Sequence, residues 1–107
     1  MPARDPLSDA AIQADLPDGW ALVADADGSR IARTYRFGDF RTAMAFLVRM
    51  AFEAEAMDHH PELTNVYDRV EIALTTHDAG NRVTETDLVL ARRLHGLARG
   101  FASAAGS

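Results

Sequence analysis

The apolar residues of this chain change their spacing twice, and this change constrains the fold more than any other feature. Between residues 40 and 54 they recur every three or four positions, which is typical of an amphipathic helix. On either side, residues 20–37 and 63–75 carry the short runs and alternations that favour β-strands. The sequence therefore predicts one long helix between two pairs of strands.

Local signals bound this middle helix. Gly38 or Asp39 is expected to cap its start. Pro61 disfavours helical backbone at the residue before it, so the helix is expected to end near Met57. The apolar side of the helix is predicted to consist of Phe40, Met44, Leu47, Ala51 and Ala54.

The first strand pair is predicted to be a hairpin of residues 20–24 and 30–37, joined at Asp27 and Gly28. Its register stays open, because the three arginines in the second strand break strict alternation. The residues expected on the core side are Ile31, Phe37 and either Thr34 or Tyr35.

The second pair is predicted to join residues 63–67 to residues 70–75 through a turn at Asp68 and Arg69. The longer strand alternates strictly between apolar residues and their neighbours, so one of its faces should be buried. That face is predicted to carry Val70, Ile72 and Leu74.

Two further helices are expected near the ends of the chain. Ser8 is predicted to cap a first helix that ends at Pro17. After a loop at residues 77–82, Thr84 or Thr86 is predicted to cap a last helix. The apolar side of this last helix is predicted to contain Leu88, Ala91, Leu94 or His95, Ala98 and Phe101.

These elements predict an α+β domain in two layers, with three helices on one face of a four-stranded antiparallel sheet. The expected order is helix, strand, strand, helix, strand, strand, helix. A chain of 107 residues, 48% of them hydrophobic, suffices for one such core and is too short for two. We expect a single domain over residues 1–107, with its core at about 8–101 and a frayed tail at 102–107.

Composition excludes several classes of function. The net charge is −5 and the basic residues are scattered, so direct binding of nucleic acid is not expected. The chain has no cysteine, which excludes disulfides and thiolate zinc sites. The N-terminus lacks the apolar segment of a signal peptide, and no apolar run approaches the roughly 20 residues that span a bilayer. We therefore expect a soluble cytoplasmic protein without a membrane partner.

Three of the four histidines lie at predicted ends of elements, with carboxylates nearby. His59 and His60 end the middle helix, and His77 follows the last strand. A two-layer domain can bring a helix end and a strand end to the same rim, so these histidines are the first candidates for a site. The carboxylates close to them in sequence, or in the first turn of the last helix, are Glu55, Asp58, Asp78 and Asp87.

Three roles are open to these histidines. Metal binding is disfavoured, because adjacent side chains project about 100° apart on a helix and to opposite faces of a strand. A structural role is favoured for each histidine taken alone, since the end of a helix attracts imidazole. Acid/base catalysis suits the set, because imidazole titrates at about 6.5. No activated covalent nucleophile and no glycine-rich phosphate loop competes, so the residues favour a reaction of proton transfers, such as elimination of water.

The segment from 55 to 87 resembles a known family signature. It has an acidic residue, three intervening positions, His-His-Pro, an aromatic residue, a later histidine and an aspartate. This pattern is similar to that of the pterin-4a-carbinolamine dehydratases, and the similarity extends over roughly residues 8–100, including Gly19-Trp20. The matching residues are Glu55, His59, His60, Pro61, Tyr67, His77 and Asp87.

The resemblance implies a hydro-lyase of tetrahydrobiopterin recycling that needs no metal and no redox cofactor. Its substrate would be the 4a-hydroxytetrahydropterin left by an aromatic amino acid hydroxylase, and its product the quinonoid dihydropterin. By the same resemblance, His59 and His77 are acid/base groups and His60 orients the pterin ring. The implied supporting residues are Glu55 beside a histidine, Asp58 as a further carboxylate, Asp87 fixing His77 or its loop, and Trp20 and Tyr67 as pocket walls or core aromatics.

The resemblance also carries expectations about partners. Subunits of the family pair into dimers or tetramers, which implies a homo-oligomer. A non-catalytic module of the same fold, which stabilises or assembles a partner protein, is the rival hypothesis, and the intact histidine set favours the enzyme. The chain departs from the family at residues 81–83, where a glycine-containing turn is common. His95 matches no position of the signature and is predicted to be structural.

Overall fold

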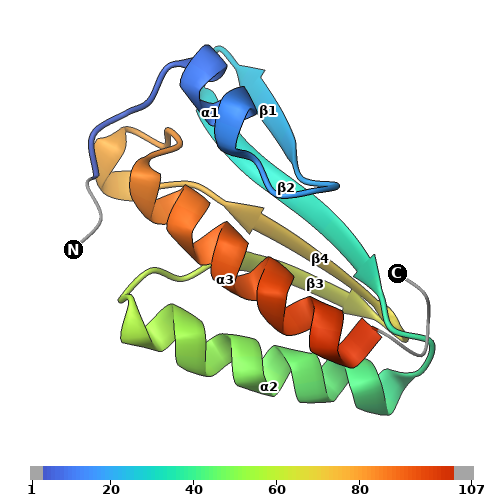
Figure 1. Ribbon diagram of the computed structural model, residues 1–107. Coiled ribbons are helices and arrows are strands. Elements are labelled where there is room, and N and C mark those ends of the chain that lie inside the picture. Colours follow the sequence, from blue (N-terminus) through green and yellow to red (C-terminus); the bar gives the residue numbers. More distant parts are fainter. Residues whose placement is uncertain (1–3, 103–107) are drawn as a thin grey trace.

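The computed structural model describes residues 4–102, and the predicted order of elements is confirmed (Figure 1). Ser8 caps α1, as predicted, through a hydrogen bond from the N–H of Ala11. Ala102 ends α3, and the rest of the tail in which fraying is predicted, residues 103–107, lies outside the described residues. The elements are α1 (Asp9–Asp15), β1 (Ala21–Asp25), β2 (Gly28–Arg36), α2 (Phe40–Ala56), β3 (Glu62–Val66), β4 (Arg69–Leu74), the short 3-10 helix η1 (His77–Ala79) and α3 (Glu85–Ala102).

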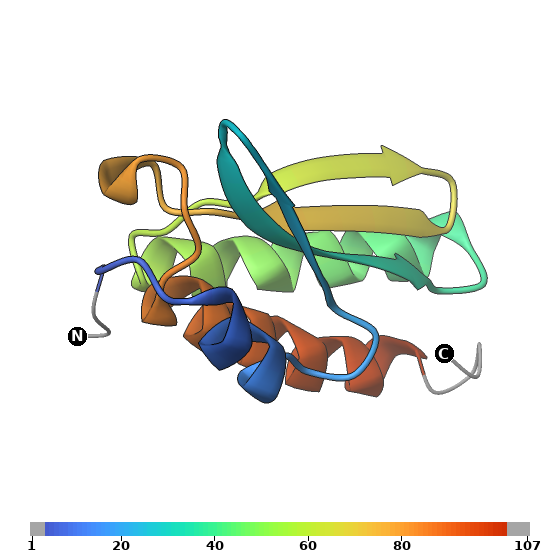
Figure 2. The ribbon, with the colours of Figure 1, turned by 90° about the horizontal axis from the view of Figure 1, so that it is seen from above.

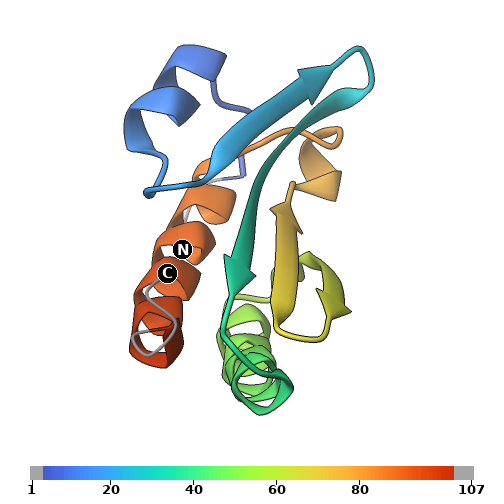
Figure 3. The same ribbon diagram turned by 90° about the vertical axis from the view of Figure 1, so that its right-hand side faces the viewer.

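The four strands form one antiparallel sheet in the order β1-β2-β4-β3. The helices α1, α2 and α3 lie on one face of the sheet, and none of them covers the other face (Figures 2 and 3). The α+β fold is thus as predicted. Within residues 4–102, no helix combines the length and the apolar composition needed to cross a membrane. The sheet residues buried under the helices are Ile31, Tyr35, Val70, Ile72 and Leu74.

Both hairpin turns fall one residue earlier than predicted. Asp25 pairs with Gly28, so Ala26 and Asp27 form the first turn, which an Asp25 side-chain bond to the Asp27 N–H supports. Gly28 belongs to β2 because the chain approaches another segment closely there: a Cβ on Gly28 would lie 2.2 Å from the carbonyl oxygen of Asn81. The glycine therefore marks a backbone contact between the hairpin and the loop after β4, rather than a turn.

The second turn consists of Tyr67 and Asp68, because Val66 pairs with Arg69. Tyr67 takes a left-handed conformation with φ of 53°. The Asn65 side chain donates to the carbonyl oxygens of Tyr67 and Arg69, which stabilises this conformation. The prediction placed the turn at Asp68 and Arg69 because aspartate favours turns. The hydrogen bonds of Asn65 stabilise a turn one residue earlier.

The predicted apolar side of α2 is largely wrong. Phe40 and Met44 are 48% and 39% exposed, and Ala51 is exposed as well, whereas Ala54 is buried as predicted and Leu47 is half-buried. The helix carries apolar residues on two sides, so spacing alone could not tell which side meets the sheet. The buried side consists of Ala43, Phe46, Met50 and Ala54, and the exposed side, called here the outer stripe, consists of Phe40, Met44, Val48 and Phe52.

A buried polar chain links β2 to α3 within the core. The indole N–H of Trp20 donates to the Tyr35 hydroxyl at 3.0 Å, and that hydroxyl lies 2.8 Å from Nδ1 of His95. The Tyr35 hydroxyl, which accepts from Trp20, can donate its own proton to Nδ1 of His95, and this nitrogen is an acceptor only in the neutral ring. Trp20 and Tyr35 are buried, and His95 has the structural partner that the sequence predicts for it.

Lowering the pH is expected to weaken the fold through His95. Burial lowers the pKa of His95, and the positive charge of Arg33 lowers it further. The unfolded chain, with a value of about 6.5, then takes up the proton more readily than the folded protein. The contribution of His95 is therefore fully present above about pH 6.5 and is lost as the pH falls through the lower folded value.

The test compares thermal midpoints of the wild type and His95→Gln at about pH 7.5 and pH 5.5. The wild type should lose more stability between the two values than the variant, because glutamine can accept the Tyr35 proton and does not titrate. Equal losses in both proteins would contradict this linkage.

Candidate active site

The end of α2 sends His59 and His60 in different directions. Met57 is the C-cap residue, and Asp58 then takes a left-handed conformation with φ of 49°. This turn lets the N–H of His59 bond back to the carbonyl of Ala54 at 3.0 Å. As a result, the His59 side chain is buried and that of His60 is exposed.

His59 is held by a buried carboxylate. Its Nε2 lies 2.5 Å from Oδ1 of Asp87, in the first turn of α3. The other oxygen of Asp87 accepts hydrogen bonds from the N–H of Thr84 and the hydroxyl of Thr76, each at 2.8 Å. Because a carboxylate only accepts, Nε2 of His59 carries a proton, and Nδ1 is the acceptor nitrogen of the neutral ring. Asp87 was predicted to fix His77 or its loop. It does not bond to His77, but it bonds to Thr76 and Thr84 at the two ends of that loop, and it also holds His59.

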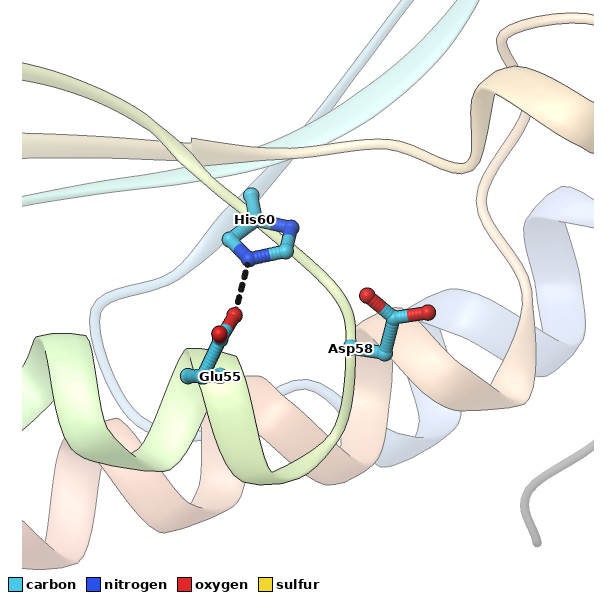
Figure 4. A group of neighbouring side chains, drawn as sticks. All are labelled: Glu55, Asp58 and His60. Atoms are coloured by element: carbon cyan, nitrogen blue, oxygen red, sulfur yellow. Dashed lines mark hydrogen bonds and ion pairs between the residues drawn. The ribbon is translucent and has the colours of Figure 1, made fainter.

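His60, Glu55 and Asp58 form an exposed group at the end of the helix (Figure 4). Nε2 of His60 lies 2.9 Å from Oε1 of Glu55, so Glu55 stands beside a histidine as predicted. One ligand atom from each of the three residues lies within 4.8 Å of the others, a spacing that could admit a cation. All three are exposed, so water competes for any ion, and the His60–Glu55 pair by itself explains the geometry.

His77 reaches the same region from the end of the sheet. It begins η1 and is exposed, and its Nδ1 lies 2.7 Å from Oδ1 of Asn81. Nδ1 therefore donates to the amide oxygen, which leaves Nε2 as the second nitrogen of the ring. Asn81 takes a left-handed conformation with φ of 59° and bonds through its N–H to the carbonyl of Thr76. Asn81, in the segment where a departure from the resembled signature was predicted, thus supplies a partner for His77.

The three histidines line one open hollow of about 220 Å³, called here the histidine hollow. The end of α2 provides His59 and His60, and the segment after β4 provides His77. Helix end and strand end thus share one rim of the domain, as the order of elements suggests. The residues that line the hollow are Arg4, Asp58, His59, His60, Thr75, His77 and Asp78.

Comparisons with known proteins agree with this geometry. The family model described as pterin 4 alpha carbinolamine dehydratase matches residues 5–97. The chain belongs to the pterin-4a-carbinolamine dehydratase family. A relative from Opitutus terrae, provisionally named pterin-4-alpha-carbinolamine dehydratase, is 57% identical over 89 residues, which are 81% of this chain and 88% of the relative.

Two solved structures resemble the fold of this family member. A protein from Brucella melitensis, described as a transcriptional coactivator/pterin dehydratase, superposes with a TM-score of 0.77 and 39% identity, over 88% of this chain and 99% of that one. A pterin dehydratase-like protein, described as a RuBisCO assembly factor in the alpha-carboxysome, superposes with a TM-score of 0.63 and 23% identity, over 75% and 89% of the two chains. The second likeness concerns the fold alone.

Trp20 and Tyr67, predicted as pocket walls or core aromatics, do not reach the histidine hollow. Trp20 is buried and its indole N–H is bonded to Tyr35. Tyr67 is 62% exposed in the turn between β3 and β4, at the end of β3 that lies away from His60. Neither lines the hollow within one chain.

Three contributors to this dehydratase-family site were not singled out for it by sequence reasoning. Thr76 and Thr84 hold Asp87, and they could be recognised only once Asp87 had been placed. Arg4 lines the hollow from the segment before α1, with no local pattern to mark it. Arg4 is separated from the histidines by a long stretch of chain, so spacing carries no signal for it. Thr76 and Thr84 lie near His77 in sequence, but no pattern links them to Asp87 before the fold brings the three together.

Proposed function

We propose that this protein eliminates water from a 4a-hydroxytetrahydropterin to give the quinonoid dihydropterin. Membership of the pterin-4a-carbinolamine dehydratase family supports a pterin substrate. The observation that carries the proposal is the convergence of His59, His60 and His77 on one hollow from separate segments of the chain. The relative orientation of three imidazoles suits proton transfer at more than one substrate atom.

In this mechanism His59 is the base. Asp87 holds its Nε2–H, so Nδ1 is the nitrogen that can take the proton from N5 of the pterin. A protonated His77 delivers a proton to the 4a-hydroxyl, and the C4a–O bond breaks with its electron pair leaving as water. The electrons of the N5–H bond form the C4a=N5 double bond, which balances the step.

His60 orients the pterin ring, and carboxylates support it. Glu55 bonds to His60 and so restricts its rotation, which keeps the exposed ring at the mouth of the hollow. Asp58 lines the hollow beside the histidines and adds an acceptor for the polar edge of the pterin. No step uses a metal ion or a redox cofactor, since the reaction consists of two proton transfers and one bond cleavage.

The experiment generates the 4a-carbinolamine with an aromatic amino acid hydroxylase and follows the decay of its absorbance. The protein at micromolar concentration should accelerate the decay, and the acceleration should survive a chelator such as EDTA. The control is an equal concentration of an unrelated protein. Decay at the same rate with this protein and with the control would rule out the activity. This function also implies a cytoplasmic setting, where the hydroxylase works.

We also infer that the protein forms a homo-oligomer through the outer stripe of α2. Phe52 and Val48 are 68% and 54% exposed, and the stripe repeats every four residues over three turns. A ridge of this kind packs against a second copy of itself, because a two-fold contact pairs the same surface on both chains. Burying these side chains would remove an exposed apolar surface from water.

The double variant Val48→Glu and Phe52→Glu should therefore shift the protein to a smaller species in gel filtration with light scattering. The double variant Ala10→Glu and Ala14→Glu, at two exposed positions on α1, is the control for the two added charges. An unchanged mass for the double variant, or a monomeric wild type, would contradict this interface.

A further inference from the structure

Arg4 belongs to a segment that the fold fastens to the site. Leu7 donates its N–H to the carbonyl of Val83 at 3.0 Å, and Pro6 forms a bridge with Thr84. Thr84 is the residue whose N–H bonds to Asp87, the partner of His59. The same short stretch before α3 therefore fixes both Asp87 and the segment that carries Arg4.

The side chain of Arg4 contributes a permanent positive charge to the histidine hollow. It is half-buried, and its Nη2 donates to the carbonyl oxygen of Asp58 at 3.2 Å. This bond uses one of the five N–H groups that a guanidinium carries. Among the described residues that line the hollow, Arg4 is the one arginine or lysine, and Asp58 and Asp78 are the two carboxylates. The histidine hollow thus combines the hydrogen-bond donors of Arg4 with the carboxylate acceptors of Asp58 and Asp78.

This combination fits the polar edge of a pterin. The pyrimidinone edge presents one acceptor, the oxygen at C4, next to two donors, the N3–H and the 2-amino group. A guanidinium supplies donors to the oxygen, and carboxylates accept from the two donors. The match to the family model begins at residue 5, so Arg4 lies outside it.

We propose that Arg4 binds the C4 oxygen of the pterin and so selects 4-oxo over 4-amino pteridines, with Asp58 or Asp78 accepting from the rest of the edge. This inference rests on the proposed function for its choice of ligand. It assigns to Arg4 a binding role rather than a part in the proton transfers. Loss of Arg4 should therefore act on substrate affinity and leave the chemical step in place.

The test uses two fluorescent probes, 6-methylpterin and 2,4-diamino-6-methylpteridine. They differ at the C4 substituent and at N3, which carries a hydrogen only in the 4-oxo compound. The wild type should bind the 4-oxo probe at least about tenfold more tightly than the 4-amino probe. This is the factor expected from one charge-assisted hydrogen bond. Arg4→Ala should weaken binding of the 4-oxo probe about tenfold and reduce the preference accordingly, leaving only the part that a carboxylate at the N3–H contributes. Arg93→Ala, which removes the same charge at an exposed position on α3, should keep the wild-type preference.

Kinetics separate a binding role from a structural one. Arg4→Ala should raise KM for the carbinolamine about tenfold and leave kcat within about twofold. Its thermal midpoint should match that of the wild type, and Arg4→Lys should restore part of the affinity, because lysine keeps the charge without the planar fork. A wild type that does not distinguish the probes, or an Arg4→Ala variant that distinguishes them equally well, would overturn the inference.

The outcome for Arg4 is separable from the outcome for the proposed function. If the wild type accelerates dehydration and Arg4→Ala has an unchanged KM, the function stands and the role of Arg4 is refuted. If the wild type fails to accelerate dehydration but its preference for the 4-oxo probe depends on Arg4, the binding role stands and the catalytic proposal falls.

Discussion

Replacing His59 with glutamine is expected to slow the catalysed dehydration by about a hundredfold to a thousandfold, the usual range for loss of a positioned acid or base. Glutamine can still donate an N–H to Oδ1 of Asp87, so the buried carboxylate keeps a partner. It offers no nitrogen that takes up a proton near neutral pH. The loss should therefore appear in kcat, with a thermal midpoint close to that of the wild type.

His95→Gln is the matched control for this variant. It makes the same chemical change at the histidine that bonds to Tyr35 and does not line the histidine hollow. Its kcat should stay within about twofold of the wild-type value, because it removes no group that reaches the substrate. A His59→Gln protein that is folded and fully active would show that His59 is not the base.

Replacing Asp87 with asparagine is expected to lower kcat by about a hundredfold or more while the protein stays folded. The amide oxygen can take the place of Oδ2 and accept from Thr84 and Thr76. The amide N–H₂ then faces Nε2 of His59, which must become an acceptor, so the proton moves to Nδ1. The nitrogen proposed to act as the base therefore carries the proton in the variant and is blocked.

Nitrogen NMR of His59 provides a direct readout of this change. The wild type should show the proton on Nε2 and the Asp87→Asn variant on Nδ1. Asp87→Ala gives the contrasting result: it leaves buried donors without a partner, including the N–H of Thr84, and should cost about 3–5 kcal/mol of stability. An Asp87→Asn variant with wild-type kcat, or with the wild-type tautomer, would refute the proposed role of the carboxylate.

Much of the fold could be predicted from local patterns in the sequence. Pro61 indicated an end of α2 near Met57, which is the C-cap residue in the structure, and alternation identified Val70, Ile72 and Leu74 as buried. Sequence patterns did not identify the buried residue where two neighbouring positions fitted the pattern equally well. Alternation alone did not choose between Thr34 and Tyr35, and the structure buries Tyr35 and exposes Thr34. Hydrophobic spacing measures amphipathicity and does not identify the partner of an apolar side, which explains the error on α2.

In the site, too, features that depend on neighbouring residues could be predicted, whereas contacts between distant segments could not. The turn of the chain after α2 separates His59 from His60, as their position before a proline suggests. The pairing of His59 with Asp87 joins residues 28 positions apart, and it exists only because α3 packs beside the end of α2. Arg4 is further still from the histidines in sequence. Such contacts arise from tertiary packing, so a resemblance could name Asp87 but could not assign its partner.

The most direct test of the central claim is the decay of hydroxylase-generated 4a-carbinolamine in the presence of the wild type and of a His59→Gln, His60→Gln and His77→Gln triple variant. The wild type should accelerate the decay at micromolar concentration, and the triple variant should return it to the uncatalysed rate while remaining folded by circular dichroism. Equal acceleration by a folded triple variant would contradict the claim that these histidines carry out the dehydration.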